Sequence, residues 1–211
     1  MGADIDLDNK RIISVQIGDA TNVELYYADS KHIEHGLPSA RDRIAEMLSK
    51  GHVFTGYNIE RFDIPNLAKF LEIQVPPSNF IDLSQTDIIK SLKRTQALYK
   101  LEDVCQRLNI PVKHKHRMNE KAETYKTRQD ILALADKEAP RIAAKRGGTV
   151  EFARKEAIGK IALGTAIFDS YKEFVGKEGS KDTLFYEYAI GDIVCEYRLF
   201  EVVKQRQCQT P

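Results

Sequence analysis

Alternation of apolar and polar residues marks the first part of the chain as a run of strands. Residues 1–7 alternate so that Asp4, Asp6 and Asp8 fall on one side of the strand and apolar residues on the other. Two further runs, rich in β-branched and aromatic residues, follow after polar turns. We expect strands over 1–7, 11–17 and 23–28, and three strands in succession predict an antiparallel meander.

The apolar residues then change to helical spacing. Ser39 is the expected N-cap of a helix that runs to Lys50. The apolar run 52–54 predicts a buried strand, which a right-handed crossover would place parallel to the first strand. The next stretch, Thr55 to Leu67 (TGYNIERFDIPNL), predicts a loop that enters an amphipathic helix ending near Leu71. A loop between a strand and a helix is where α/β proteins place their sites.

The rest of the chain has a mainly helical pattern. A short strand is expected at 80–83, and Pro111 ends the helix that comes before the segment 113–180. That segment predicts a helical insertion, with Gly147 and Gly148 as a turn inside it. The remaining helices that we expect span 86–92, 100–108, 150–175 and 182–205.

Length and composition indicate a soluble globular protein of one domain, 1–211. Hydrophobic residues make up 42% of the chain and charged residues 30%. No apolar run approaches the roughly 20 residues needed to cross a bilayer. No signal-peptide pattern opens the chain, so we expect a cytoplasmic protein without a membrane partner. Three cysteines without paired spacing argue against a disulfide framework or a zinc ribbon, and Cys105 and Cys195 are expected as small core residues.

Charge is distributed unevenly along the chain. Between Lys113 and Arg128 there are six Lys or Arg residues against two Glu, although the formal net charge of the chain is only +1. A basic segment beside a group of carboxylates suits a polyanion held near a metal, and solvated helix faces are the alternative explanation. Lys113, Lys115 and Arg117 are the best candidates for contacts with a nucleic-acid backbone.

Aspartates recur where a structural role does not explain them. Asp4 and Asp6 share one side of a strand, and neighbouring carboxylates repel each other unless a positive charge compensates. Asp192 lies in an apolar run, four residues after Tyr188 and on the same helix face, where an unpaired charge is costly. With Asp63 in the loop, these oxygen donors would suit Mg²⁺. An exposed edge strand and an ordinary surface aspartate paired with a nearby arginine are the alternatives.

Three stretches of the chain resemble the motifs of one enzyme family. TGYNIERFDIPNL resembles the second exonuclease motif of family B DNA polymerases and of the wider DnaQ-like 3′–5′ exonucleases. ADIDLDNKRIISVQIGD is similar to their first motif, and YAIGD (Tyr188 to Asp192) to their third motif in its tyrosine form. The segments IDLSQTDIIKSL and QALYKLEDVCQRLNI are also similar to the family, so that the resemblance covers about 1–112 and 183–203.

The resemblance implies an α/β fold of the ribonuclease H-like type, a mixed five-stranded sheet flanked by helices, with 113–180 as an added helical insertion. It implies a 3′–5′ exonuclease that releases nucleoside monophosphates from single-stranded or frayed DNA. Two divalent ions, Mg²⁺ or Mn²⁺, would bind the attacking water and the leaving oxygen. The family's metal ligands fall on Asp4, Asp6, Asp63 and Asp192. Tyr188 would orient the water, and Asn58 and Phe62 would hold the terminal nucleotides.

The chain departs from the family at the first motif. The usual Asp-x-Glu is Asp4-Ile5-Asp6 here, which leaves Asp6 one methylene shorter than a glutamate. A weakened exonuclease fold that binds single-stranded nucleic acid or a protein, and an exoribonuclease, are therefore kept as alternatives. The position that carries His in the histidine subclass is Glu187. A polymerase or another replication or repair protein is an expected partner.

The histidines show no spacing with carboxylates that would make a zinc site. We expect surface or capping roles for all of them: His32, His35, His52, His114 and His116. The insertion is expected to form a basic wall that guides the strand toward the metals.

Overall fold

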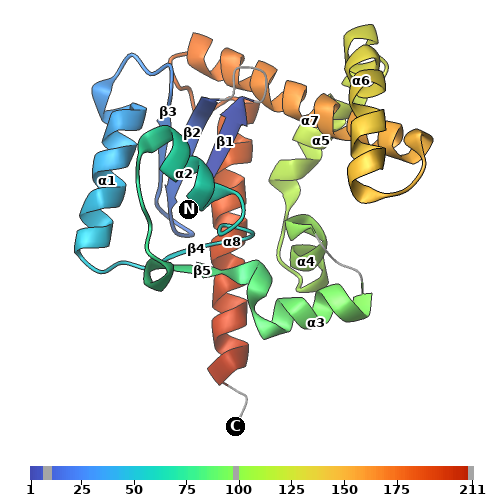
Figure 1. The fold of residues 1–211 in the computed structure, drawn as a ribbon. Coiled ribbons are helices and arrows are strands. Elements are labelled where there is room, and N and C mark those ends of the chain that lie inside the picture. The colour runs from blue at the N-terminus through green and yellow to red at the C-terminus, as the bar shows by residue number, and fades with distance from the viewer. Residues whose placement is uncertain (7–10, 97–99, 209–211) are drawn as a thin grey trace.

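The computed structural model describes residues 1–6, 11–96 and 100–208, which form an α/β structure rich in helices (Figure 1). Its strands are β1 (Gly2–Asp6), β2 (Arg11–Gly18), β3 (Val23–Tyr27), β4 (Phe54–Gly56) and β5 (Phe80–Asp82). Its helices are α1 (Leu37–Ser49), α2 (Asp63–Leu71), α3 (Asp87–Gln96), α4 (Leu101–Arg107), α5 (Lys113–Tyr125), α6 (Gln129–Arg146), α7 (Val150–Gly176) and α8 (Leu184–Cys208). The order of strands and helices predicted from the sequence is confirmed.

The first three strands form an antiparallel sheet with β2 in the middle, as predicted. Residues 12–17 of β2 are all buried, which means that both faces of this strand are covered. Val15 and Ile17 belong to a core that contains Ile44 of α1 and Leu67 of α2. Ile13 belongs to a separate core with α7 and α8.

The last two strands, β4 and β5, pair in parallel and form a separate small sheet. Among the described residues, the five strands therefore form one sheet of three and one of two, and the continuous five-stranded sheet that we expected is not present. The chain just before β1 contacts β4, where the Met1 amino group donates to the Thr55 carbonyl at 2.9 Å. A Cβ on Gly56 would lie 3.1 Å from the Met1 carbonyl oxygen, so the backbones of these residues are in contact.

The start of α1 differs from the sequence prediction. The helix begins at Leu37 with Pro38 in its first turn and Gly36 at the N-cap position, so Ser39 is not the cap. Proline is favoured there because its fixed φ is already helical and its missing N–H is not needed. The Ser39 hydroxyl instead donates to the carbonyl of Ile33 at 2.6 Å and ties the helix to the preceding turn.

Helix α8 runs through the centre of the molecule and touches both sheets (Figure 1). Its first half packs with α7 against the three-stranded sheet, through Phe185 and Ala189. Its second half packs against α4, where the Sγ atoms of Cys195 and Cys105 lie 3.0 Å apart. Both cysteines are buried and free, which confirms their expected place in the core.

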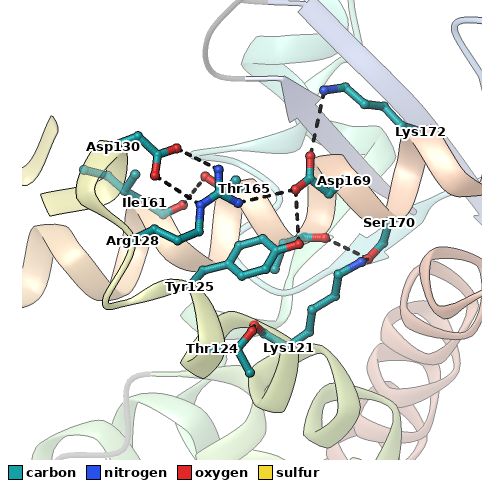
Figure 2. Close-up of polar contacts among 11 residues, drawn as sticks. Lys121, Thr124, Tyr125, Arg128, Asp130, Ile161, Thr165, Asp169, Ser170 and Lys172 are labelled. Atoms are coloured by element: carbon teal, nitrogen blue, oxygen red, sulfur yellow. Dashed lines mark hydrogen bonds and ion pairs between the residues drawn. The ribbon is translucent and has the colours of Figure 1, made fainter. Parts of the chain in front are cut away.

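Helices α5 and α6 and the first part of α7 form an arm beside the sheets, and the end of α7 packs on the three-stranded sheet (Figure 1). Alanines line the contact between α6 and α7, and small side chains allow two helices to approach closely. Polar contacts fix α5 to α7 at the base of the arm (Figure 2). The Tyr125 hydroxyl donates to Asp169 at 3.1 Å, Arg128 lies 3.8 Å from the same carboxylate, and Lys121 donates to the Ser170 hydroxyl at 2.8 Å.

Candidate active site

The loop after β4 is held by a carboxylate from β5. Asp82 accepts hydrogen bonds from the backbone N–H groups of Asn58 at 3.0 Å and Ser84 at 2.8 Å. Asn58 has a φ of 62°, a left-handed conformation that asparagine tolerates better than most residues. The predicted nucleotide-binding residue Asn58 is therefore fixed at a tight turn by its own backbone, and Asp82 has a structural role.

Asp63 is the first residue of α2 and is buried, with 6% of its surface exposed. A carboxylate at a helix N-terminus is favoured because the first backbone N–H groups point toward it. Phe62, the residue before it, is 47% exposed although it is a large apolar side chain. The structure thus places an exposed ring directly beside a buried acid.

Helix α8 presents three polar side chains at a spacing of four residues: Tyr188, Asp192 and Glu196. Residues four apart lie on the same face of a helix. Asp192 Oδ1 accepts from Lys115 Nζ and lies within hydrogen-bonding distance of His114 Nε2, each at 2.9 Å. Burial alone would raise the pKa of the Asp192 carboxyl, but Lys115 and His114 outweigh burial and hold that pKa below its usual value.

Glu196 connects the loop to α8. Its Oε1 accepts from the backbone N–H of Tyr57 at 3.1 Å, whereas Oε2 is buried and no group in the described part of the chain donates to it. Burial raises the pKa of Glu196 to about 8, and the negative charges of Asp63 and Asp192 add to the shift, while the N-terminal amino group opposes it. The hydrogen bond from Tyr57 joins the loop to this face of α8, and the charges of Asp63 and Asp192 both act on Glu196.

Lys115 is part of this region rather than a solvent-facing phosphate contact. Only 16% of its side chain is exposed, and its ammonium group also lies 5.6 Å from the centre of the Tyr188 ring. Burial lowers the pKa of Lys115, but Asp192 more than compensates and raises it overall. Arg117, by contrast, is 63% exposed and pairs with Glu187.

The other predicted ligands lie in β1. The backbone of β1 is placed by its pairing with β2, where Asp4 faces Ser14 and Asp6 faces Arg11. The side chains of Asp4 and Asp6 lie outside the described residues, as does that of Lys113. Met1 touches the loop at Thr55. At about 3.3 Å per residue, the backbone of Asp4 lies roughly 10 Å from Met1 along the strand, and that of Asp6 roughly 16 Å from Met1.

Two members of the region were missed in the sequence. His114 was expected in a surface or capping role, but it is 9% exposed and its ring packs on α8. A Cβ on Gly191 would lie 2.2 Å from His114 Cγ, so glycine at this position is what admits the ring. Glu196 could have been found from its spacing of four residues after Asp192. His114 could not, because its contact depends on how α5 docks.

Among the side chains that the structure describes, no three His, Cys, Asp or Glu residues are placed so that they could hold a metal ion. Within the same part of the chain, no helix has both the length and the apolar content to span a bilayer. Comparisons with protein-family models, with curated proteins and with solved structures returned no significant match.

Proposed function

We propose that the protein is a 3′–5′ exonuclease of the DnaQ-like, tyrosine-containing type, acting on single-stranded or frayed 3′ ends. The observation that carries the proposal is the meeting of the loop 55–67 with α8 through Glu196. Asp63 from the loop and Asp192 from α8 are separated by most of the chain, yet both raise the pKa of the same glutamate. These are the segments that resemble the second and third motifs of the exonuclease family.

The arrangement of the strands supports the same proposal. A ribonuclease H-like sheet would place β4 beside β1, and the hydrogen bond between Met1, next to the start of β1, and Thr55 of β4 supports that placement. The pairing of β1 with β2, of β2 with β3, and of β4 with β5 in parallel is also what that sheet requires. We infer that the two sheets are parts of a ribonuclease H-like core.

The donor chemistry of the region fits a divalent cation. Asp63 and Glu196 offer carboxylate oxygens, the donors that Mg²⁺ and Mn²⁺ prefer, and the buried Oε2 of Glu196 accepts from no described group. These two residues would hold an ion, with the predicted Asp4 as the nearest of the β1 ligands. Such an ion supplies a polarised water and charge neutralisation at phosphorus.

Other residues of the region bind and orient the substrate in this proposal. The exposed ring of Phe62 offers a stacking surface for the terminal base, next to Asp63. The Tyr188 ring lies beside Lys115 and His114, so its position on α8 is fixed by packing. The Tyr188 hydroxyl would hold the attacking water in place, because a phenol with an unperturbed pKa of about 10 is a poor base at neutral pH.

The proposal is tested by incubating the protein with end-labelled single-stranded DNA, duplex DNA and RNA, with Mg²⁺ or Mn²⁺. We expect stepwise shortening from the 3′ end of single-stranded DNA, and loss of at least about 100-fold in rate for Asp63→Asn. Asp136→Asn is the matched control, because it removes an exposed carboxylate on the arm. Absence of metal-dependent products, or equal rates for Asp63→Asn and the wild type, would refute the proposal that the protein is an exonuclease. Faster loss of RNA would assign an exoribonuclease.

A binding module without catalysis is the second candidate. It is favoured by one observation, that Asp192 is already neutralised by Lys115 and His114. In that case the protein would bind labelled single strands in a gel-shift assay with equal affinity in Mg²⁺ and in chelator, and no products would appear.

A further inference from the structure

We propose that Lys115 is a built-in cation of the candidate site and takes the place of a divalent ion at Asp192. The inference rests on the proposed function, because it concerns how the same site is charged. The family resemblance predicts two metal ions, with Asp192 among their ligands. The structure instead places a lysine ammonium 2.9 Å from Asp192 Oδ1.

The pair is enclosed rather than exposed. The side chains of Lys115 and Asp192 are 16% and 25% exposed, whereas the ion pairs of the arm have partners that are mostly 40% exposed or more. Separating two partly buried charges leaves each of them without compensation, which is costly. A metal ion in water would have to displace a cation that is already in place.

The docking of α5 on its neighbours fixes the position of Lys115. The His114 ring sits in the notch at Gly191, one residue before Asp192, and its Nε2 lies at the same oxygen as Lys115. At the other end of α5, Tyr125 and Lys121 are held by α7 (Figure 2). Lys115 is thus carried by a helix fixed at both ends and not by a loop that could swing away.

The ammonium group of Lys115 can also bind substrate, in addition to neutralising the charge of Asp192. A lysine has three N–H donors, and Asp192 takes one of them. Among the described residues no other side chain takes a hydrogen bond from this ammonium group, and its remaining donors would serve a phosphate oxygen that enters beside Tyr188, whose ring centre lies 5.6 Å from Nζ. Lys115 would therefore position the scissile phosphate while Asp63 and Glu196 hold a single ion.

Counting bound Mn²⁺ in the full chain by electron paramagnetic resonance tests this assignment without measuring cleavage. We expect the wild type to bind one ion, and Lys115→Gln to bind a second ion or to bind about tenfold more tightly, because a repelling charge is removed. Lys126→Gln, which changes an exposed lysine at the C-cap of the same helix, should behave as the wild type. Equal binding by Lys115→Gln and the wild type, including no binding by either, would overturn the proposal.

A second variant covers the case in which Lys115→Gln does not fold. Asp192→Asn should leave Mn²⁺ binding of the wild type unchanged, because in this proposal Asp192 is not a ligand while Lys115 is present. Weaker binding by Asp192→Asn would make Asp192 a ligand and refute the assignment. The exonuclease proposal is refuted if no cleavage products form, whereas the assignment of Lys115 is refuted by the Mn²⁺ binding results, so the two failures are distinguishable.

Discussion

Two regions of the molecule handle charge in opposite ways. In the arm, exposed cations and anions pair with one another, as in Arg146–Glu156 and Arg154–Asp136. Around α8, Lys115 and Asp192 pair with less of each side chain exposed, and burial raises the pKa of Glu196 to about 8. Exposed pairs contribute little to stability, whereas buried unbalanced charge costs stability and is kept where a site needs it. Density of charge along the sequence is thus a weaker guide to function than its burial.

The comparison also bears on the basic wall that we expected the insertion to form. Of its first cations, Lys115 is bound to Asp192 and Arg117 to Glu187. Further along the insertion, Arg128, Arg146 and Arg154 are paired within the arm. Guidance of a strand by this arm stays a prediction, and it now depends on these ion pairs opening.

The largest effect on the free energy of unfolding is expected at the contact between α5 and α8. Gly191→Ala should lower the free energy of unfolding by about 3 kcal/mol, because the new Cβ would overlap the His114 ring. Gly159→Ala in α7 is the matched control, since nothing lies within 4 Å of its Cβ and alanine stabilises a helix interior by about 1 kcal/mol. Urea unfolding of both variants measures the difference. Equal effects would show that α5 does not dock on α8 as described.

The next largest effect is the change in stability with pH that the Glu196 carboxyl causes. The pKa of Glu196 is about 8 in the folded protein against 4.5 ordinarily, so between these values the folded state holds a proton that the unfolded state lacks. That contribution is complete below pH 4.5 and is lost as the pH rises through 8. Glu196→Gln lacks it, and its free energy of unfolding should therefore rise relative to that of the wild type as the pH increases from 5 to 8. Parallel stability curves for the two proteins would contradict the burial of this carboxyl.

The smallest effect is expected in the arm. Arg154→Gln breaks the exposed pair with Asp136 and should change the free energy of unfolding by at most about 0.5 kcal/mol. Adding salt should reduce even that difference, because exposed pairs are screened. If Arg154→Gln lowered the free energy of unfolding as much as Gly191→Ala, the exposed pairs of the arm would stabilise the protein as strongly as the buried contacts around α8. The contrast between the two regions would then be wrong.

Much of the fold could be predicted from the sequence because it depends on local periodicity. The β-branched residues in 11–17 and the helical pattern in 150–175 identified β2 and α7. The division into two sheets could not be predicted, since it depends on whether a strand of only three residues, β4, pairs with β1. Ser39 was misassigned because Pro38 sets the helix start one turn earlier.

The candidate site could be predicted in part, and for a different reason. Asp63, Tyr188 and Asp192 were predicted by resemblance to motifs, and the charges of Asp63 and Asp192 both act on Glu196. The roles of Lys115 and His114 were not found, because they depend on how α5 crosses α8 and no pattern within α5 encodes that crossing. A hydrogen bond from the Tyr57 backbone to Glu196 is likewise invisible in the sequence.

The central position of α8 has a consequence for the order in which the protein is made. This helix carries Asp192 and Glu196 and contacts both sheets, yet the ribosome synthesises it after every other described element. Before α8 has been made, the core around Ile13 lacks Phe185 and Ala189, and the backbone of Tyr57 lacks the carboxylate of Glu196. The candidate site therefore comes into being only after α8 has been synthesised, so that a chain lacking α8 would not yet possess it.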